Sequence, residues 1–266
     1  MAADTCSASS LAAGELLAGT ATQARRWLLV EAREPWARDV DETALPEHVR
    51  ELVHGFDGRV QLIRRPGRRG HERRAFVAET SDAGGTLRRL DTLDDVEGGE
   101  PIDASMVLVC CHGRRDPCCA RLGTPVFDAL GPHVSGETLW QSSHLGGHRF
   151  AANVLVLPEG ILLGRVRPAD APGVAAELAA GRIPLEHYRG RTIHPPEAQV
   201  ADAAVRQRLG LTGIGDVAVI SSANGQVRLA TPTGDIDAAV EVDRGLPLLE
   251  SCGKEPAASV RYSVHW

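Results

Sequence analysis

The stretch Met106-Val107-Leu108-Val109-Cys110 is a continuous apolar run near the middle of the chain. Such a run predicts a central β-strand buried on both faces of a sheet, because it offers no polar side chain to solvent on either face. A helix is expected after it, over about Ala120–Leu130. The pattern then predicts a strand at Thr138–Gln141, a hairpin of Asn153–Leu157 and Ile161–Val166 around Pro158-Glu159-Gly160, and a helix at Val174–Ala180.

This order of elements, β-α-β-β-β-α, predicts an α/β protein of mixed α+β type. Its expected architecture is a thioredoxin-like sandwich, in which helices pack on a mixed sheet. Further along the chain, the residues predict a helix at about Glu197–Leu209 and three strands, which we expect to extend or cover the sheet. These strands are Val217–Ile220, Gln226–Ala230 and Ser259–Val264.

The first hundred residues predict a separate α/β pattern. We expect helices at Leu11–Leu17 and Pro46–Phe56, and strands at Trp27–Glu31, Val60–Ile63, Arg74–Val77 and Thr86–Leu90. Asp94–Asp103 is rich in Asp, Glu and Gly, which is typical of a linker. We therefore divide the chain into an N-terminal α/β module at 1–100, for which a thioredoxin-like fold is one option, and a thioredoxin-like domain with a strand-rich extension at 101–266.

Composition excludes several classes of protein. The chain has 266 residues, of which 43% are hydrophobic and 24% charged, a balance that supports a packed core and argues against disorder. The formal net charge of −6 argues against a nucleic-acid binder. No run of about 18 apolar residues is present, and the N-terminus lacks the pattern of a secretory signal. We therefore expect a cytoplasmic protein whose thiols stay reduced.

One basic run, Arg64–Arg74, lies between two expected strands. Its simplest interpretation is a solvated hairpin loop, and the alternative is a docking surface for an acidic redox partner.

Four of the six cysteines lie within ten residues, directly after the buried strand. That segment is Cys110-Cys111-His112-Gly113-Arg114-Arg115-Asp116-Pro117-Cys118-Cys119. A second polar segment, Ser143-His144-Leu145-Gly146-Gly147-His148-Arg149-Phe150, follows the next strand, and its paired glycines allow a tight turn. Because such folds bind ligands at the carboxyl ends of their strands, we expect thiolates and imidazoles to meet at one edge of the sheet.

The cysteine and histidine segments by themselves leave three interpretations open. The cysteines could be core residues and the histidines surface residues, although four cysteines in ten is dense for packing alone. The group could be a structural Cys2His2 zinc site, which accepts this ligand set. It could also be an iron–sulfur cluster, in which histidines can replace two of the cysteines.

The two segments, taken from Val109 to Ala120 and from Ser143 to Ala151, resemble the sucrase/ferredoxin-like family, a branch of the thioredoxin-like [2Fe–2S] ferredoxins. The similarity covers most of the chain and includes Cys6-Ser7, Gly19-Thr20-Ala21, Trp27–Glu31, Pro35-Trp36 and Leu155–Gly160.

Members of this family hold a [2Fe–2S] cluster with two cysteines separated by eight residues and two histidines separated by three. The resemblance therefore implies that Cys110, Cys119, His144 and His148 are the ligands of a [2Fe–2S] cluster in this chain. It also implies that the neighbouring Cys111 and Cys118 are not ligands and pack beside the cluster, an assignment that could shift by one residue within each pair.

Four polar residues of the two loops could act around the cluster. His112, Arg115, Asp116 and Arg149 either maintain the loops, with Asp116 capping the following turn, or tune the cluster potential by hydrogen bonds and charge. Cys6 and Cys252 lie far away in the sequence, and we interpret both as structural.

The function that follows is one-electron transfer. No Gly-x-Gly-x-x-Gly fingerprint follows a strand, so electrons would come from a separate redox partner, a reductase or an acceptor. Catalysis is not supported: no pair of carboxylates for sugar hydrolysis lies in the loops, and the Cys-x-x-Cys spacing of thiol–disulfide exchange is missing. The alternative from another class is a zinc-binding Cys2His2 structural or interaction module without redox activity.

Overall fold

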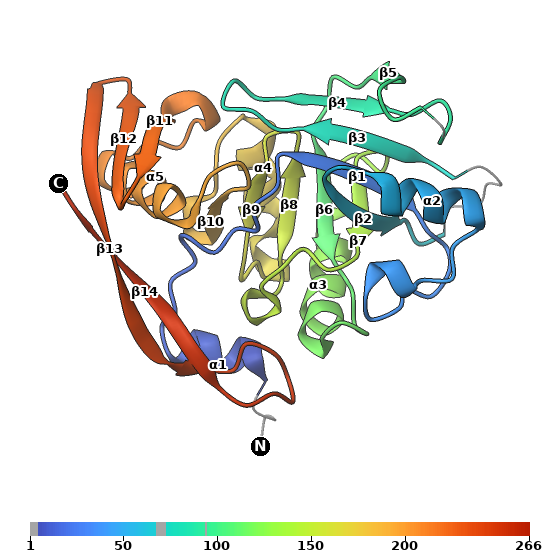
Figure 1. The fold of residues 1–266 in the computed structure, drawn as a ribbon, viewed down its shortest axis with the longest axis horizontal. Coiled ribbons are helices and arrows are strands. Elements are labelled where there is room, and N and C mark those ends of the chain that lie inside the picture. The colour runs from blue at the N-terminus through green and yellow to red at the C-terminus, as the bar shows by residue number, and fades with distance from the viewer. Residues whose placement is uncertain (1–4, 68–72, 94) are drawn as a thin grey trace.

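Strand β6 (Met106–Cys110) lies in the middle of a large sheet in the computed structural model, which describes residues 5–67, 73–93 and 95–266 (Figure 1). All five of its residues are buried, as the apolar run predicts. Strand β7 (Leu139–Ser142) pairs with it in parallel on one side, and β8 (Val154–Leu157) pairs antiparallel on the other. Helix α3 (Pro117–Leu130) connects β6 to β7, so the residues after both strands lie at the same edge of the sheet.

The large sheet contains two copies of one strand order. In the second half of the chain, β9 (Ile161–Leu163) extends the order to β7-β6-β8-β9. In the first half, the strands follow the order β2-β1-β3-β4. Strand β2 is parallel to β1 and β3 is antiparallel to β1, as β7 and β8 are to β6. These strands are β1 (Arg26–Glu31), β2 (Arg59–Arg64), β3 (Ala75–Glu79) and β4 (Thr86–Arg89), and α2 (Glu47–Gly55) connects β1 to β2.

The two copies join through an antiparallel pairing of β2 with β7, in which Ile63 lies opposite Ser142. Strands β10 (Tyr188–Arg191) and β5 (Glu100–Pro101) form the two edges of the ten-stranded sheet. The expected linker at Asp94–Asp103 thus contains an edge strand, and its residue 94 lies outside the described residues. Because one sheet runs through both halves, the boundary at residue 100 stays a prediction.

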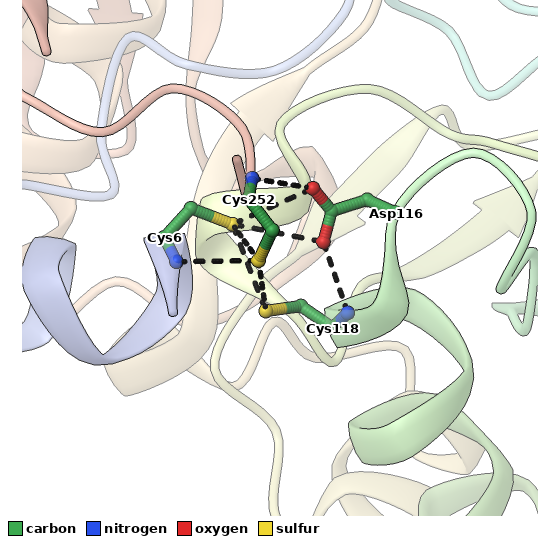
Figure 2. A group of neighbouring side chains, drawn as sticks. All are labelled: Cys6, Asp116, Cys118 and Cys252. Carbon is green, nitrogen blue, oxygen red and sulfur yellow. Dashed lines mark hydrogen bonds between the residues drawn. The ribbon is translucent and has the colours of Figure 1, made fainter. Parts of the chain in front are cut away.

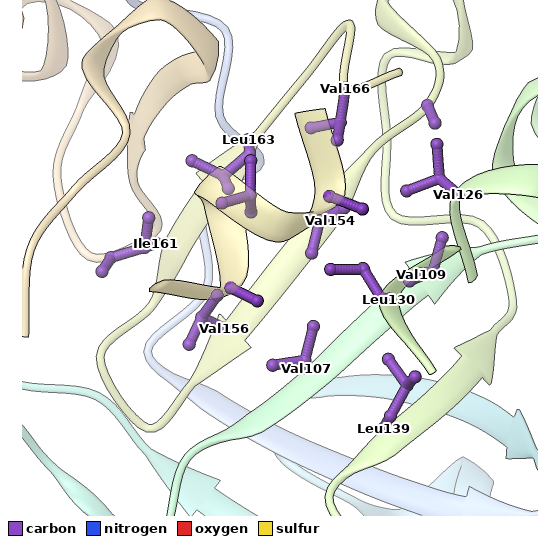
Figure 3. Close-up of a cluster of buried hydrophobic side chains, with 14 of the residues drawn as sticks. Val107, Val109, Val126, Leu130, Leu139, Val154, Val156, Ile161, Leu163 and Val166 are labelled. Carbon is purple, nitrogen blue, oxygen red and sulfur yellow. The ribbon is translucent and has the colours of Figure 1, made fainter. Parts of the chain in front are cut away.

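The core beside β6 is made by aliphatic side chains of the sheet and of two helices, α3 and α4 (Ala171–Ala179). Figure 3 shows Val126 and Leu130 of α3 directed at Val107, Val109 and Leu139 of the sheet. Burial of each such side chain contributes roughly 1.5–3 kcal/mol. The strands and α3 are therefore held together by an aliphatic core.

The C-terminal strands form a second sheet, which excludes one of the two expected arrangements, extension of the large sheet. The order of the second sheet is β11-β12-β13-β14, and helix α5 (Pro196–Leu209) packs against it with Val200 and Val205. The long strand β13 was not predicted. With β14 it forms a hairpin that reaches down to helix α1 (Cys6–Ala12) (Figure 1). The bounds are β11 (Ala218–Ala223), β12 (Gln226–Thr231), β13 (Gly234–Leu248) and β14 (Ala257–His265).

Two local predictions near the N-terminus were wrong. The first helix runs over Cys6–Ala12 and not over Leu11–Leu17, because Thr5 caps it: the Thr5 Oγ1 accepts a hydrogen bond of 3.2 Å from the backbone N–H of Ala8. The basic run is not a hairpin loop, since β2 and β3 pair on opposite sides of β1.

The arginines at the ends of the basic run bind within the chain. Arg65 and Arg74 both pair with Glu137, and Arg73 pairs with Glu34. Residues 68–72 of the run lie outside the described residues.

Short 3-10 turns lie at η1 (Val40–Glu42), η2 (His148–Phe150), η3 (Pro168–Asp170), η4 (Leu185–His187) and η5 (Ile214–Asp216).

Candidate metal centre

Three of the four predicted ligands meet at the edge of the sheet. Cys110 is the last residue of β6, Cys119 lies in the first turn of α3, and His144 follows β7. One donor atom from each lies within 4.8 Å of the other two, and His144 Nδ1 is 3.7 Å from Cys119 Sγ. Both thiols are at most 1% exposed. This group could hold a metal ion.

The fourth predicted ligand, His148, lies beside this group. Its ring centroid is 5.0 Å from that of His144, and its Nε2 is 3.6 Å from a carboxylate oxygen of Asp116. Both ring nitrogens of His148 are buried without a well-formed hydrogen bond, and the acceptors beside the ring are the Asp116 carboxylate and the backbone carbonyl of Glu250. Burial lowers the pKa of His148, which favours the neutral imidazole that binds metals.

The two thiols form a hydrogen-bonded pair in which the Cys119 thiol donates to Cys110. The pKa of Cys110 is lowered because Cys119 and His144 donate hydrogen bonds to its sulfur, and these bonds outweigh the effect of burial. The pKa of Cys119 is raised, since it keeps the proton that the pair shares. A cation in the group would replace that proton, because metal binding requires both sulfurs as thiolates.

Local sequence explains the shape of the cysteine loop. Asp116 is the N-cap of α3: its Oδ1 accepts a 2.9 Å hydrogen bond from the backbone N–H of Cys118, as the prediction of a capping role requires. Pro117 follows at the first helical position, where its missing N–H costs nothing. The cap begins α3 directly after the loop and thereby points Cys119 back toward Cys110.

The histidine loop depends on its paired glycines. Gly146 and Gly147 have φ values of +93° and +64°, which other residues rarely adopt. A Cβ on Gly147 would lie 2.5 Å from Arg189 Nη2. The glycines therefore allow the chain to turn closely around a buried guanidinium between the two histidines.

Arg189 is a residue of this site that sequence reasoning missed. It is 1% exposed and donates to Gly146 O at 3.0 Å, to Asn153 Oδ1 at 2.8 Å and to Thr20 Oγ1 at 2.9 Å. Burial lowers its pKa to about 9, and the charge of Cys110 opposes that shift. Arg59 holds the same loop from β2 through a 3.2 Å hydrogen bond to His144 O. Only the folded chain brings these distant arginines to the loop, so no local signal could have identified them.

Three of the residues considered for tuning the site make their direct side-chain contacts outside the ligand group, and their tuning role stays a prediction. The ring of His112 bonds to Ala37 O at 2.7 Å, its backbone amide donates to the Cys110 thiol, and the charge of Cys110 also acts on its ring. Arg115 forms an ion pair with Asp39. Arg149 pairs with Glu15 at 2.9 Å, on the side of α1. Asp116 is the exception, because its carboxylate lies against His148.

The remaining cysteines separate into two environments. Cys111 packs in the aliphatic core beside α3, and burial raises the pKa of its thiol to about 12. Cys118 instead lies against Cys6 and Cys252, with Asp116 beside them (Figure 2). Sequence analysis did not predict this second group, whose three cysteines lie more than a hundred residues apart.

The fold and the site together define a mixed α+β protein with buried cysteine and histidine groups that could hold metal. A sequence model of the sucrase/ferredoxin-like family matches residues 17–190, more than half of the chain. The chain therefore belongs to the sucrase/ferredoxin-like family.

Curated relatives match a smaller part of the chain. "Altered inheritance of mitochondria protein 32" of Clavispora lusitaniae is 34% identical over 101 residues, which cover 35% of this chain and 37% of the relative. The protein of the same name from Eremothecium gossypii is 29% identical over 106 residues, 35% of this chain and 34% of the relative. The matched segment thus spans about a third of the length of these relatives. No solved structure matches the chain.

Among the helices of the described residues, none combines the length and the apolar character needed to cross a bilayer.

Proposed function

We propose that this protein is a one-electron carrier that binds a [2Fe–2S] cluster through Cys110, Cys119, His144 and His148. The observation that carries the proposal is the meeting of two buried thiols and an imidazole within 4.8 Å, next to a second imidazole whose buried nitrogens lack a well-formed hydrogen bond. A buried polar atom without a partner is costly, and ligation would satisfy it. Two sulfurs and two neutral imidazoles suit a [2Fe–2S] cluster with mixed ligands.

The strand order supports the thioredoxin-like assignment within this proposal. Strands β7-β6-β8-β9, with helix α3 after β6 and α4 after β9, have the directions that we expect for a thioredoxin-like sandwich. The first half of the chain repeats the order, which favours a thioredoxin-like N-terminal module as well.

The ligand set would make the site easy to reduce. A bound cluster supplies a one-electron couple, and replacing two thiolates by neutral imidazoles removes about two negative charges from it. The buried guanidinium of Arg189 adds positive charge at the same place. Both features favour the reduced state, so we propose a potential above that of all-cysteine ferredoxins.

Exposure suggests where electrons enter and leave. The two cysteines are almost fully buried, whereas His144 and His148 are partly exposed. We therefore propose that a separate redox partner docks over the histidine loop and not on the basic run, whose described arginines are engaged within the chain. Six free cysteines are consistent with a reducing compartment such as the cytoplasm.

The proposal is tested by purifying the chain without oxygen and measuring its visible absorption together with iron and acid-labile sulfide. We expect a coloured protein with about two irons per chain, bleached by dithionite. Cys110→Ser and Cys119→Ser should lose colour and iron. The matched control is Cys111→Ala, which removes a neighbouring thiol that faces the aliphatic core.

Two outcomes contradict the proposal. A colourless wild-type protein that holds zinc at this group would instead favour the zinc-binding structural module. Loss of colour in Cys111→Ala with retention in Cys110→Ser would show that the assigned ligand is wrong by one residue.

A further inference from the structure

Three thiols from distant parts of the chain meet at a second place. Cys6 begins helix α1, Cys118 lies in the first turn of α3, and Cys252 lies in the loop between β13 and β14 (Figure 2). Their sulfurs form a nearly regular triangle, with distances of 3.6 Å from Cys6 to Cys118, 3.5 Å from Cys118 to Cys252 and 3.6 Å from Cys252 to Cys6. Cys6 and Cys118 are buried.

The carboxylate of Asp116 lies beside this triangle and offers a fourth possible ligand. Cys6 Sγ lies 3.7 and 3.8 Å from the two oxygens of Asp116, and one oxygen lies within 4.8 Å of all three sulfurs. Asp116 is itself fixed, because its oxygens accept hydrogen bonds from the backbone N–H of Cys118 at 2.9 Å and of Cys252 at 2.8 Å.

These distances are close to those of tetrahedral zinc. With Zn–S bonds of about 2.3 Å and a Zn–O bond of about 2.1 Å, ligand sulfurs lie about 3.8 Å apart and sulfur and oxygen about 3.6 Å apart. The triangle would need to expand by only a few tenths of an ångström. A disulfide, in contrast, requires sulfurs about 2.05 Å apart and would join only two of the three thiols.

We propose that Cys6, Cys118, Cys252 and Asp116 form a second metal site, a structural site for Zn²⁺ that is separate from the Cys110 group. Soft thiolates select Zn²⁺ over hard cations, and the carboxylate gives the four donors of a closed tetrahedral site. Backbone amides support the thiolates: the N–H of Cys6 donates to Cys252 Sγ at 3.5 Å, and that of Ser7 donates to Cys118 Sγ.

The charges in the group favour a cation. Hydrogen bonds from Cys6 and Cys252 lower the pKa of Cys118 to about 6, while the pKa values of Cys6 and Cys252 are raised. Three thiolates beside the Asp116 carboxylate would bring four negative charges together. A divalent cation allows all three to be thiolates.

The site would clamp helix α1 and the tip of the β13–β14 hairpin to the cysteine loop. Its apolar surroundings are small: among the described residues, Ala151 is the one other buried hydrophobic residue of this cluster, and Leu122 and Leu249 pack against it partly buried. Helix α1 and the tip of the β13–β14 hairpin therefore have little core of their own here. Cys6 and Cys252 lie outside the family match at 17–190.

The test is metal analysis of the full chain, purified with reductant and without chelator, for zinc and iron separately. We expect about one zinc per wild-type chain. Cys6→Ala and Cys252→Ala should each lose at least ten-fold in bound zinc and keep the iron and visible colour of the wild type. Cys111→Ala, another single thiol deletion, should keep both metals.

A second measurement uses only the wild-type chain and so does not require any variant to fold. Wild-type chain stripped of zinc should bind Co²⁺ with the intense visible absorption of a tetrahedral thiolate site, and Zn²⁺ should bleach it. The metal should also protect Cys252, the most exposed of the three thiols, from alkylation. Three results would overturn the proposal: a wild type that binds neither ion here, zinc that persists in Cys252→Ala and disappears in Cys110→Ser, or a disulfide among these three cysteines in the freshly purified protein.

Discussion

Gly147→Ala tests how the histidine loop is held. Gly147 has a φ of +64°, and a methyl group there would lie 2.5 Å from Arg189 Nη2 and 3.0 Å from the ring of Phe150. The left-handed backbone costs an alanine about 1–2 kcal/mol, and overpacking against these buried groups adds roughly 1–3 kcal/mol. We therefore expect the free energy of unfolding to fall by roughly 2–5 kcal/mol in total. The loop should also shift, and with it both histidines.

Stability is measured by urea unfolding of the metal-free chain in reductant, with circular dichroism as the signal. The iron content of the purified protein is measured separately. Gly210→Ala is the matched control. Its φ of +69° is nearly the same, but no atom lies within 4 Å of the added methyl, so it should lose only about 1–2 kcal/mol and keep its iron. Equal losses of stability and unchanged iron in the two variants would refute the argument that Arg189 and Gly147 fix the loop.

Three further predictions concern other parts of the chain. His144→Cys should keep a cluster and lower its midpoint potential by on the order of 100 mV, as voltammetry would measure, because a neutral ligand becomes anionic; an unchanged potential would argue against histidine ligation. Cys111 should resist alkylation at pH 8 in the folded chain, because burial raises the pKa of its thiol to about 12 and the thiolate forms only at strongly alkaline pH. Rapid labelling seen by mass spectrometry would contradict its place in the core. Arg206→Met should lower the free energy of unfolding, measured by urea titration, by about 3–5 kcal/mol. The substitution leaves the buried carboxylate of Asp202, which lies 2.9 Å from Arg206 Nε, without its cation. A loss below about 1 kcal/mol would show that this pair is dispensable.

Local patterns in the sequence were sufficient for most of the large sheet. The apolar run Met106–Cys110 is strand β6 at its expected bounds, and the Pro158-Glu159-Gly160 turn does connect the antiparallel strands β8 and β9. Both succeed because the signal is short-range: burial on two faces requires a continuous apolar strand, and a tight turn requires particular residues.

The predictions failed at one local helix cap and at one strand whose pairing is decided by tertiary structure. The helix expected at Leu11–Leu17 rested on apolar residues, but Leu11 and Leu16 are 62% and 56% exposed, and the helix that forms begins at the cap of Thr5. Strand β13 is rich in Asp and Gly, which disfavour strands, and it is extended because β12 and β14 pair with it on both sides.

The sequence by itself determined the cysteine and histidine loops, because each follows a strand of the same parallel pair and so reaches the same edge of the sheet. Tertiary structure alone decided what surrounds them. Arg189 reaches the histidine loop from 43 residues beyond Gly146, and Cys118 meets Cys6 and Cys252 across 112 and 134 residues of chain. No periodicity or spacing encodes such contacts, because they arise only when packing of α1, α3 and the β13–β14 hairpin brings distant segments together.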